Sequence, residues 1–379
     1  MARVKLGDVA KESKGAVKNA RELPTVGLEH LTPGVLELER WDETSETTFT
    51  KAFKKDQILF GRRRAYLKKA AVAPFDGVCS GDITVIEAIP GKIDKRLLPF
   101  VIHNDALFDF AMSRSAGGLS PRVKWNDLKE FEFNLPPIEE QARIADLLWA
   151  MNDTKKAYRN LLAATDELVK ARFVEMFGDP ENNNKLWPIQ TLEKLCYVGS
   201  SKRIYQHELK PSGISFLRIS DLIIKMNKGI PDSRLYISKA KYEELLKLGL
   251  VPIPGDILIT SRGTLGLCYI VKNEDKFYFQ DGMISWLSKI DNRIDPIYLK
   301  YLFTMPGFRT QLNILQAGST VTFLSISMLK KLKIMVPSKT AQKSFSSFVN
   351  QIEEVKISIC ASITRTERII NSLLNNHLS

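Results

Sequence analysis

Arginine, serine and threonine side chains gather at a few turn-like stretches of this sequence, often beside glycine. The stretch "FGRRRAYLKK" (60–69) carries three arginines beside an aromatic residue, and "TSRGTLG" (260–266) places hydroxyl groups and an arginine on a glycine-rich loop. A guanidinium can make two hydrogen bonds with a guanine edge or with a pair of phosphate oxygens. Bare glycine backbone also lets a phosphate approach closely. These residue types at these positions predict contacts to nucleic acid.

Similar stretches occur at "KESKGAVKNAR" (11–21), "SRSAGGLSPRVKW" (113–125), "GSSKRIYQ" (199–206) and "LQAGSTVTF" (315–323). A charged turn is usually only a solvated turn, so the prediction depends on the whole set and not on any one side chain. The candidate DNA-binding residues are Lys14, Lys18, Arg62, Arg63, Arg64, Arg114, Ser120, Arg122, Lys124, Ser201, Lys202, Arg203, Ser261, Arg262, Thr264, Ser319, Thr320 and Thr322.

The charge balance agrees with a polyanionic partner. The chain has 55 Lys and Arg against 43 Asp and Glu, which gives a formal net charge of +12. An excess of positive charge attracts polyanions at long range, and nucleic acid is the usual one. With 44% hydrophobic and 26% charged residues, the 379-residue chain has the composition of a globular protein with two or three domains.

Two motifs imitate catalytic signatures, and we interpret both as structural. "NLPPI" (134–138) has the two prolines of the base-gripping loop of amino-methyltransferases, but a leucine intervenes and no aromatic residue follows. A strand-to-helix break explains these prolines better. Asp256, Glu274 and Lys276 imitate the metal site of a nuclease, although acidic residues near turns usually make local hydrogen bonds. No GxxxxGK[ST] loop is present, and we expect no catalytic residues in this chain.

Cysteine and histidine usage predicts no metal site. The four cysteines are scattered without a CxxC pair, and the four histidines are equally isolated. This pattern is typical of reduced thiols in a cytoplasmic protein. No run of about 18 apolar residues predicts a membrane span. The segment 1–15 lacks the apolar core of a signal peptide.

The sequence contains an internal repeat. "LPPIEEQARIADLL" (135–148) recurs as "VPSKTAQKSFSSFV" (336–349), at an offset of 201 residues. Earlier stretches match in the same order, with Asp56 over Asp256 and Arg62 over Arg262, although the Glu274–Lys276 pair is not repeated. Such self-similarity predicts one structural unit built twice.

Each copy ends in a predicted helix of about 40 residues, about 60 Å long. Seam positions step by three and four residues, which favours coiled-coil packing of the two helices against each other, although threonine and serine also fall on the seam. The predicted apolar seam residues are Leu147, Met151, Tyr158, Leu161, Leu168, Phe348, Ile352, Val355, Ile359 and Ile369.

The predicted fold class is α+β, with two mixed α/β domains in a tandem pseudo-two-fold repeat, separated by two long antiparallel coiled-coil helices. The predicted boundaries are 1–136 for domain 1, 137–178 for helix 1, 179–190 for a linker, 191–337 for domain 2 and 338–379 for helix 2. Domain 1 has the shorter loops, and we expect it to be trimmed but intact.

The whole chain resembles the specificity (S) subunit of type I restriction–modification enzymes. The resemblance depends on the order of mixed domain, Pro-x-x-x-x-Gln break and long helix, repeated once, and on the strings "GDITVI" (81–86) and "GLSPRVKWNDL" (118–128). It implies that each mixed domain reads one half of a bipartite double-stranded DNA site, while the helices set the spacer between the halves.

The resemblance also implies a non-catalytic chain without a cofactor of its own. Two DNA adenine methyltransferase (modification) subunits would supply S-adenosylmethionine, and restriction subunits would supply ATP- and Mg-dependent translocation and cleavage. No membrane partner is implied. Two alternatives stay open at the level of sequence: a two-lobed coiled-coil adaptor that does not read DNA, and a stand-alone endonuclease using Asp256, Glu274 and Lys276.

Overall fold

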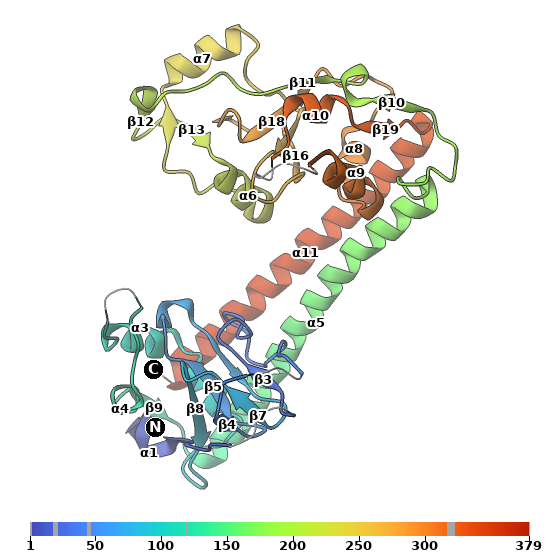
Figure 1. Ribbon diagram of the computed structural model, residues 1–379. Coiled ribbons are helices and arrows are strands. Elements are labelled where there is room, and N and C mark those ends of the chain that lie inside the picture. Colours follow the sequence, from blue (N-terminus) through green and yellow to red (C-terminus); the bar gives the residue numbers. More distant parts are fainter. Residues whose placement is uncertain (1, 18–21, 44–46, 118–119, 317–322, 379) are drawn as a thin grey trace. The chain divides into compact units, whose positions relative to one another are not determined.

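A computed structural model describes residues 2–17, 22–43, 47–117, 120–316 and 323–378 (Figure 1). The chain divides into two compact units. Unit 1 contains Met1–Leu161 and Ile359–Ser379, and unit 2 contains Leu162–Ser358.

Unit 1 contains short strands and helices arranged in three small sheets. The elements are β1 (Ala2–Lys5), α1 (Leu6–Val9), β2 (Ala10–Glu12), β3 (Thr25–Val26), β4 (Lys51–Phe53), β5 (Ile58–Gly61), η1 (Ala65–Leu67), β6 (Ala70–Val72), β7 (Gly77–Cys79), β8 (Ile83–Ala88), α2 (Leu98–Ile102), α3 (Asp105–Ser113), α4 (Trp125–Leu128) and β9 (Glu132–Leu135). The strands are ordered β2-β8-β5-β6, β3-β7-β4 and β1-β9.

Unit 2 repeats this plan with ten strands in place of nine in the described part of the chain, and with longer helices. Its elements are β10 (Ile189–Thr191), η2 (Leu192–Lys194), β11 (Tyr197–Gly199), η3 (Gln206–Glu208), β12 (Leu209–Lys210), β13 (Ile214–Leu217), α6 (Ile219–Lys228), β14 (Tyr236–Ile237), α7 (Lys239–Lys247), β15 (Ile257–Thr260), β16 (Cys268–Ile270), β17 (Phe277–Phe279), β18 (Ile284–Ser288), α8 (Pro296–Leu302), α9 (Pro306–Gln316), α10 (Ile326–Lys330) and β19 (Lys333–Met335). The strands are ordered β11-β18-β15-β16, β12-β14-β13-β17 and β10-β19.

The strand register shows which residues of the two copies are equivalent. Ile58 of β5 pairs with Ile86 of β8, and Ile257 of β15 pairs with Leu287 of β18. Each copy also contains one parallel pair of strands, which is β3 with β7 in unit 1 and β13 with β17 in unit 2. Shared pairing of this kind confirms that one fold is built twice.

The register corrects one detail of the sequence alignment. Ala73 N donates to Gln57 O and Val271 N donates to Asp256 O, so Asp256 is equivalent to Gln57 and not to Asp56. The same offset of 199 residues pairs Arg262 with Arg63, whereas the sequence comparison paired it with Arg62. A one-residue slip is easily made because the matching strands are only four residues long in both copies.

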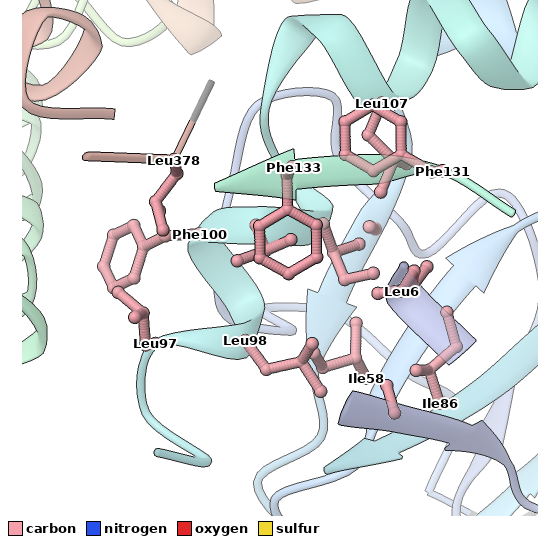
Figure 2. Packing of buried hydrophobic residues seen from close by; sticks show 14 of the residues in the cluster. Leu6, Ile58, Ile86, Leu97, Leu98, Phe100, Leu107, Phe131, Phe133 and Leu378 are labelled. Atoms are coloured by element: carbon pink, nitrogen blue, oxygen red, sulfur yellow. The ribbon is translucent and has the colours of Figure 1, made fainter. Parts of the chain in front are cut away.

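Each unit has an apolar core that includes residues of both long helices. In unit 1, Ile144 and Leu148 pack into the same cluster as Leu378, the last residue of the second long helix. Figure 2 shows Leu378 directed toward Phe100 and Leu97 at the edge of this core. In unit 2, Phe173 stacks on Tyr298 with ring centroids 5.5 Å apart, and it also contacts Phe345. The long helices are therefore part of each folded unit.

The two long helices are α5 (Ile138–Phe177) and α11 (Lys339–Leu378), each of 40 residues. They run antiparallel within each unit. In unit 1, Glu367 of α11 faces Lys155 of α5 at 3.9 Å. In unit 2, Lys356 pairs with Asp166, and Phe345 meets Phe173. The predicted fold class, two mixed α/β domains in tandem with antiparallel coiled-coil helices, is confirmed.

Half of the ten predicted seam residues lie on the packed faces of the helices, and the other half are exposed. Leu147, Leu161 and Leu168 are 45–49% exposed, and Val355 and Ile369 are 46% and 42% exposed. The buried positions of α5 fall one residue later, at Leu148, Asn152 and Val169 among others. Of the predicted residues, Ile359 is buried, and Met151, Tyr158, Phe348 and Ile352 are partly buried. On α5 the three predicted leucines therefore lie beside the seam, whereas on α11 most of the predicted residues lie on it.

Candidate nucleic-acid interface

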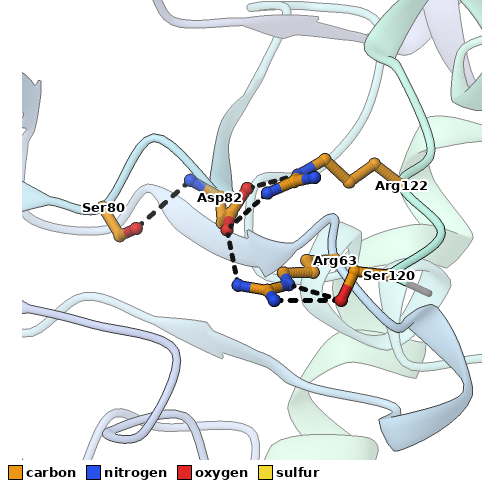
Figure 3. A network of polar contacts seen from close by, with 5 residues as sticks. All are labelled: Arg63, Ser80, Asp82, Ser120 and Arg122. Atoms are coloured by element: carbon orange, nitrogen blue, oxygen red, sulfur yellow. Dashed lines mark hydrogen bonds and ion pairs between the residues drawn. The ribbon is translucent and has the colours of Figure 1, made fainter. Parts of the chain in front are cut away.

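A polar network joins three distant turns of unit 1 (Figure 3). Asp82, in the turn between β7 and β8, accepts hydrogen bonds from Arg122 Nε at 2.7 Å and from the Arg122 Nη2 at 3.2 Å. Arg63 contacts the same carboxylate at 3.5 Å and donates to Ser120 Oγ at 2.9 Å. We call Arg63, Ser80, Asp82, Ser120 and Arg122 the Asp82 network. It orients two arginines whose side chains are still 38% and 42% exposed.

Electrostatics stabilises this network. Hydrogen bonding to Arg122 holds the pKa of Asp82 below its usual range, and the positive charges of Arg122, Arg63 and Arg62 act in the same direction. Ser80 Oγ accepts the Asp82 backbone N–H at 3.2 Å, which fixes the turn itself. Asp82 therefore stays ionised at neutral pH and restrains both guanidinium groups.

The structure brings together only some of the candidate residues of unit 1. Arg63, Ser120 and Arg122 meet in the Asp82 network, and Arg64 is exposed beside it, with its N–H bonded to Pro121 O at 2.9 Å. Arg62 is partly buried, and its Nε has no hydrogen-bond partner in the described part of the chain. The side chains of Lys14, Arg114 and Lys124 are exposed and make no contact with the network within the described part of the chain, and Lys18 lies outside the described residues.

Unit 2 places its arginines around a pocket of about 460 Å³. Arg203 pairs with Asp281 at 2.9 Å, in the turn equivalent to that of Asp82. The Arg262 guanidinium lies 5.2 Å from the centroid of the Phe323 ring. We call this cavity the unit 2 pocket, and its polar lining consists of Arg203, Gln206, Arg218, Arg262, Gln280 and Asp281.

Two serines predicted to contact DNA are buried instead. Ser261 is 2% exposed, and its Oγ lies 2.6 Å from Ser285 Oγ. Ser201 is 9% exposed and donates to Phe279 O at 2.7 Å. Both hydroxyls satisfy interior hydrogen bonds, so these two predictions are wrong. Lys202 and Thr264 are exposed. Ser319, Thr320 and Thr322 lie outside the described residues.

Sequence reasoning missed Asp82, Arg218 and Gln280. Asp82 was visible as the acid of "GDITVI", but nothing in the sequence pairs it with Arg122, 40 positions away. Arg218 and Gln280 each stand directly after a short buried strand, β13 or β17. That position, at the strand end, is the signal that could have found them.

Asp256, the central residue of the nuclease alternative, has a structural role. Asp256 is 4% exposed and accepts hydrogen bonds from Trp286 Nε1 at 2.8 Å and from Ile253 N at 2.9 Å. Burial raises the pKa of this carboxyl group. Glu274 faces solvent near Lys272. Within the described ranges no group of three or more His, Cys, Asp or Glu side chains could hold a metal ion.

The thiols are also mostly interior. Cys79, Cys196 and Cys268 are buried, and burial raises the pKa of each to about 12, whereas Cys360 on α11 is exposed. Among the helices that the structure describes, none has the length and hydropathy needed to cross a membrane.

The fold and these sites define a class of protein: a duplicated α+β scaffold whose two copies each carry an arginine, Arg63 or Arg262, at the same turn. The type I restriction modification DNA specificity domain matches this chain twice, at residues 1–162 and 184–366. The chain therefore belongs to the family of type I restriction–modification specificity proteins, as the repeat led us to expect.

Curated relatives carry the same designation. The chain is 30% identical over 139 residues to the type I restriction enzyme EcoDI specificity subunit of Escherichia coli, covering 36% of this chain and 31% of that protein. It is 22% identical over 287 residues to the MjaVIII specificity subunit of Methanocaldococcus jannaschii, covering 70% and 66%. The matches thus span 66% or less of the length of these relatives.

Solved structures share the fold. A chain from work on complex assembly and conformational transition of the type I R-M system aligns with a TM-score of 0.56 at 18% identity, over 99% of this chain and 97% of that one. The type I restriction–modification S subunit from M. genitalium aligns with a TM-score of 0.55 at 15% identity, over 100% and 96%. At these identities the likeness concerns the fold alone.

Proposed function

We propose that this chain is the non-catalytic DNA-sequence specificity subunit of a type I restriction–modification complex in the cytoplasm. Each mixed domain reads one half of a bipartite DNA site, and α5 and α11 set the spacer. One observation carries the proposal: Arg63 and Arg262 occupy the same backbone position, each at an antiparallel bridge to the segment that contains residue 122 or 323. The same backbone arrangement thus carries an arginine that can bind DNA in each of the two domains.

The long helices are suited to hold the catalytic partners. Apolar side chains on their outer faces are exposed at 42–69%, which supports docking of two adenine methyltransferase subunits, one to each pseudo-equivalent face. These subunits bring S-adenosylmethionine, and restriction subunits bring the ATP- and Mg-dependent steps. The exposed apolar residues are Leu147, Leu161, Leu168, Val174, Val355, Ile357 and Ile369.

Domain exchange tests the assignment. The full chain is produced with its modification subunits, and the methylated adenines are mapped. Replacement of residues 1–134 by another recognition domain is expected to change one half of the methylated site and to leave the other half unchanged. An unchanged motif would contradict the role given to unit 1.

DNA binding itself separates this function from an adaptor that does not read DNA. A mobility-shift titration of the complex is expected to give a linear fall of log affinity with log salt, because phosphate contacts release counterions. Absence of binding to duplex DNA at low salt would favour the adaptor.

A further inference from the structure

The turns after two neighbouring strands have the same backbone in both units but different side chains. Gln280 N donates to Leu217 O at 2.9 Å, and Ser80 N donates to Val26 O at 3.0 Å. Because β13 and β17 pair in the same way as β3 and β7, Gln280 is equivalent to Ser80. By the same register, Arg218 is equivalent to Gly27, since each follows the last residue of its strand.

In unit 2 these two positions carry long polar side chains that line the unit 2 pocket. The Arg218 side chain is 51% exposed and has one weak contact, from Nε to Asp221 Oδ2 at 3.4 Å. Its backbone N–H bonds the same oxygen at 2.9 Å, so the position is fixed while the guanidinium stays available. The Gln280 side-chain amide has no hydrogen-bond partner among the described residues.

The other two arginines of the pocket have partners of a different kind. Arg203 is paired with Asp281 at 2.9 Å, and Arg262 lies over the Phe323 ring. In unit 1 the two equivalent positions have no long polar side chain: Gly27 has none, and the Ser80 hydroxyl accepts the N–H of Asp82. The units therefore differ at the two positions where unit 2 has uncommitted hydrogen-bonding groups.

The chemistry of these two groups matches base edges. Arginine makes two hydrogen bonds to O6 and N7 of guanine, and glutamine makes two to N6 and N7 of adenine. A pair of halves that share a backbone frame but differ in these side chains would read two different base sequences, as an asymmetric site requires.

We propose that Arg218 and Gln280 are specificity-determining residues that read purine edges, in the major groove of the half-site bound by unit 2. This proposal rests on the function proposed above. The nearby Arg203 and Arg262 keep the pocket basic and oriented toward the duplex.

The test uses the full chain together with its modification subunits, in a host without other adenine methylation. Methylated positions are mapped by single-molecule sequencing for the wild type and for Arg218→Lys and Gln280→Glu. Arg218→Lys keeps the charge but loses the paired donors, and Gln280→Glu replaces the donor group with a second acceptor. Lys239→Ala is the control, because this side chain is 75% exposed on α7 of the same unit.

Each variant is expected to lower the preference for the wild-type base over the other bases by about tenfold or more, at one or two adjacent positions of a single half-site. The other half-site and the control are expected to keep the wild-type motif, which also shows that the variant is folded. Three results overturn the proposal: an unchanged motif in both variants, an equal loss of methylation at every site with an intact motif, or a change in the half-site that exchange of residues 1–134 assigns to unit 1. A wild-type complex that writes no bipartite motif would instead refute the proposed function, before any variant is compared.

Discussion

Gln141 donates its side-chain amide to the carbonyl oxygen of Pro136 at 2.8 Å, and Gln342 makes the same contact with Pro337. Each glutamine also accepts a backbone N–H at 2.8 Å, from Asp94 or from Asp295. Both side chains are at most 2% exposed. The repeated Pro-x-x-x-x-Gln pattern is therefore a clasp that fixes the first turn of each long helix to its mixed domain.

Loss of the unit 2 clasp is expected to be costly. Gln342→Ala leaves the Asp295 N–H and the carbonyl oxygens of Pro337 and Arg293 without this partner. Buried groups left unsatisfied cost about 1–3 kcal/mol each, so we expect a loss of about 2–4 kcal/mol in the free energy of unfolding. Denaturant titration measures the loss. Lys343→Ala, at the exposed neighbouring position, is the control, and equal stability of the two variants would contradict the clasp.

The long helices were predictable from the sequence, but the face that packs was predictable only in part. Leu147, Leu161 and Leu168 were predicted to lie on the seam but are exposed, while Asn152 and the partly buried Lys155 lie on it and were not predicted. Polar groups can lie on the seam because they find partners there. Lys155 faces Glu367, and Thr165 donates to Leu162 O. Hydrophobic periodicity does not reveal a seam that contains polar residues, whether their partners lie on the other helix, as for Lys155, or on the same one, as for Thr165.

Two adjacent residues of α5 test the register. Val169 is fully buried and Leu168 is 49% exposed. Val169→Ala is expected to destabilise the chain by about 1–2 kcal/mol through the lost burial and the cavity left behind, whereas Leu168→Ala should change stability by less than about 0.5 kcal/mol. Thermal unfolding of the isolated chain compares them. A larger effect at Leu168 would restore the register predicted from the sequence.

The candidate interface was predictable in its residue types and turns, and less so in its contacts. The recurrence of arginine after β5 and β15 was visible, although the strands are too short to fix the alignment to one residue. The Asp82 network joins positions up to 57 residues apart, and no local pattern encodes such pairing. Ser201 and Ser261 were misassigned because the sequence does not show whether a serine at a turn points toward solvent or into the core.

The shared arginines should behave as phosphate contacts. Arg63 and Arg262 recur at one backbone position in domains that differ elsewhere, which is expected of a contact that positions the duplex. Arg63→Ala and Arg262→Ala are each expected to weaken binding similarly on all sequences, and to reduce the slope of log affinity against log salt by about 0.9. Titrations at several salt concentrations provide the measurement. Lys239→Ala removes one charge elsewhere on unit 2 and should leave the slope unchanged.

A buried histidine predicts how unit 1 responds to acid. His103 Nε2 is buried without a hydrogen-bond partner among the described residues, and burial lowers the pKa of the ring to about 4, against about 6.5 when unfolded. Between pH values of about 4 and about 6.5, His103 is therefore protonated in the unfolded chain and neutral in the folded chain. The contribution of His103 to the free energy of unfolding is therefore fully present above about pH 6.5, and it is lost progressively as the pH falls toward 4.

His103→Phe removes this proton and keeps an aromatic ring next to Phe108, whose ring centroid lies 6.4 Å from that of His103. The free energy of unfolding is measured for both proteins at about pH 7 and about pH 4.5. Because carboxyl groups titrate in both proteins, only the difference between them reports on His103. We expect the wild type to lose about 2 kcal/mol more than the variant over this interval. An equal loss in both proteins would mean that the folded chain accepts the proton, and that the ring is not held neutral by its surroundings.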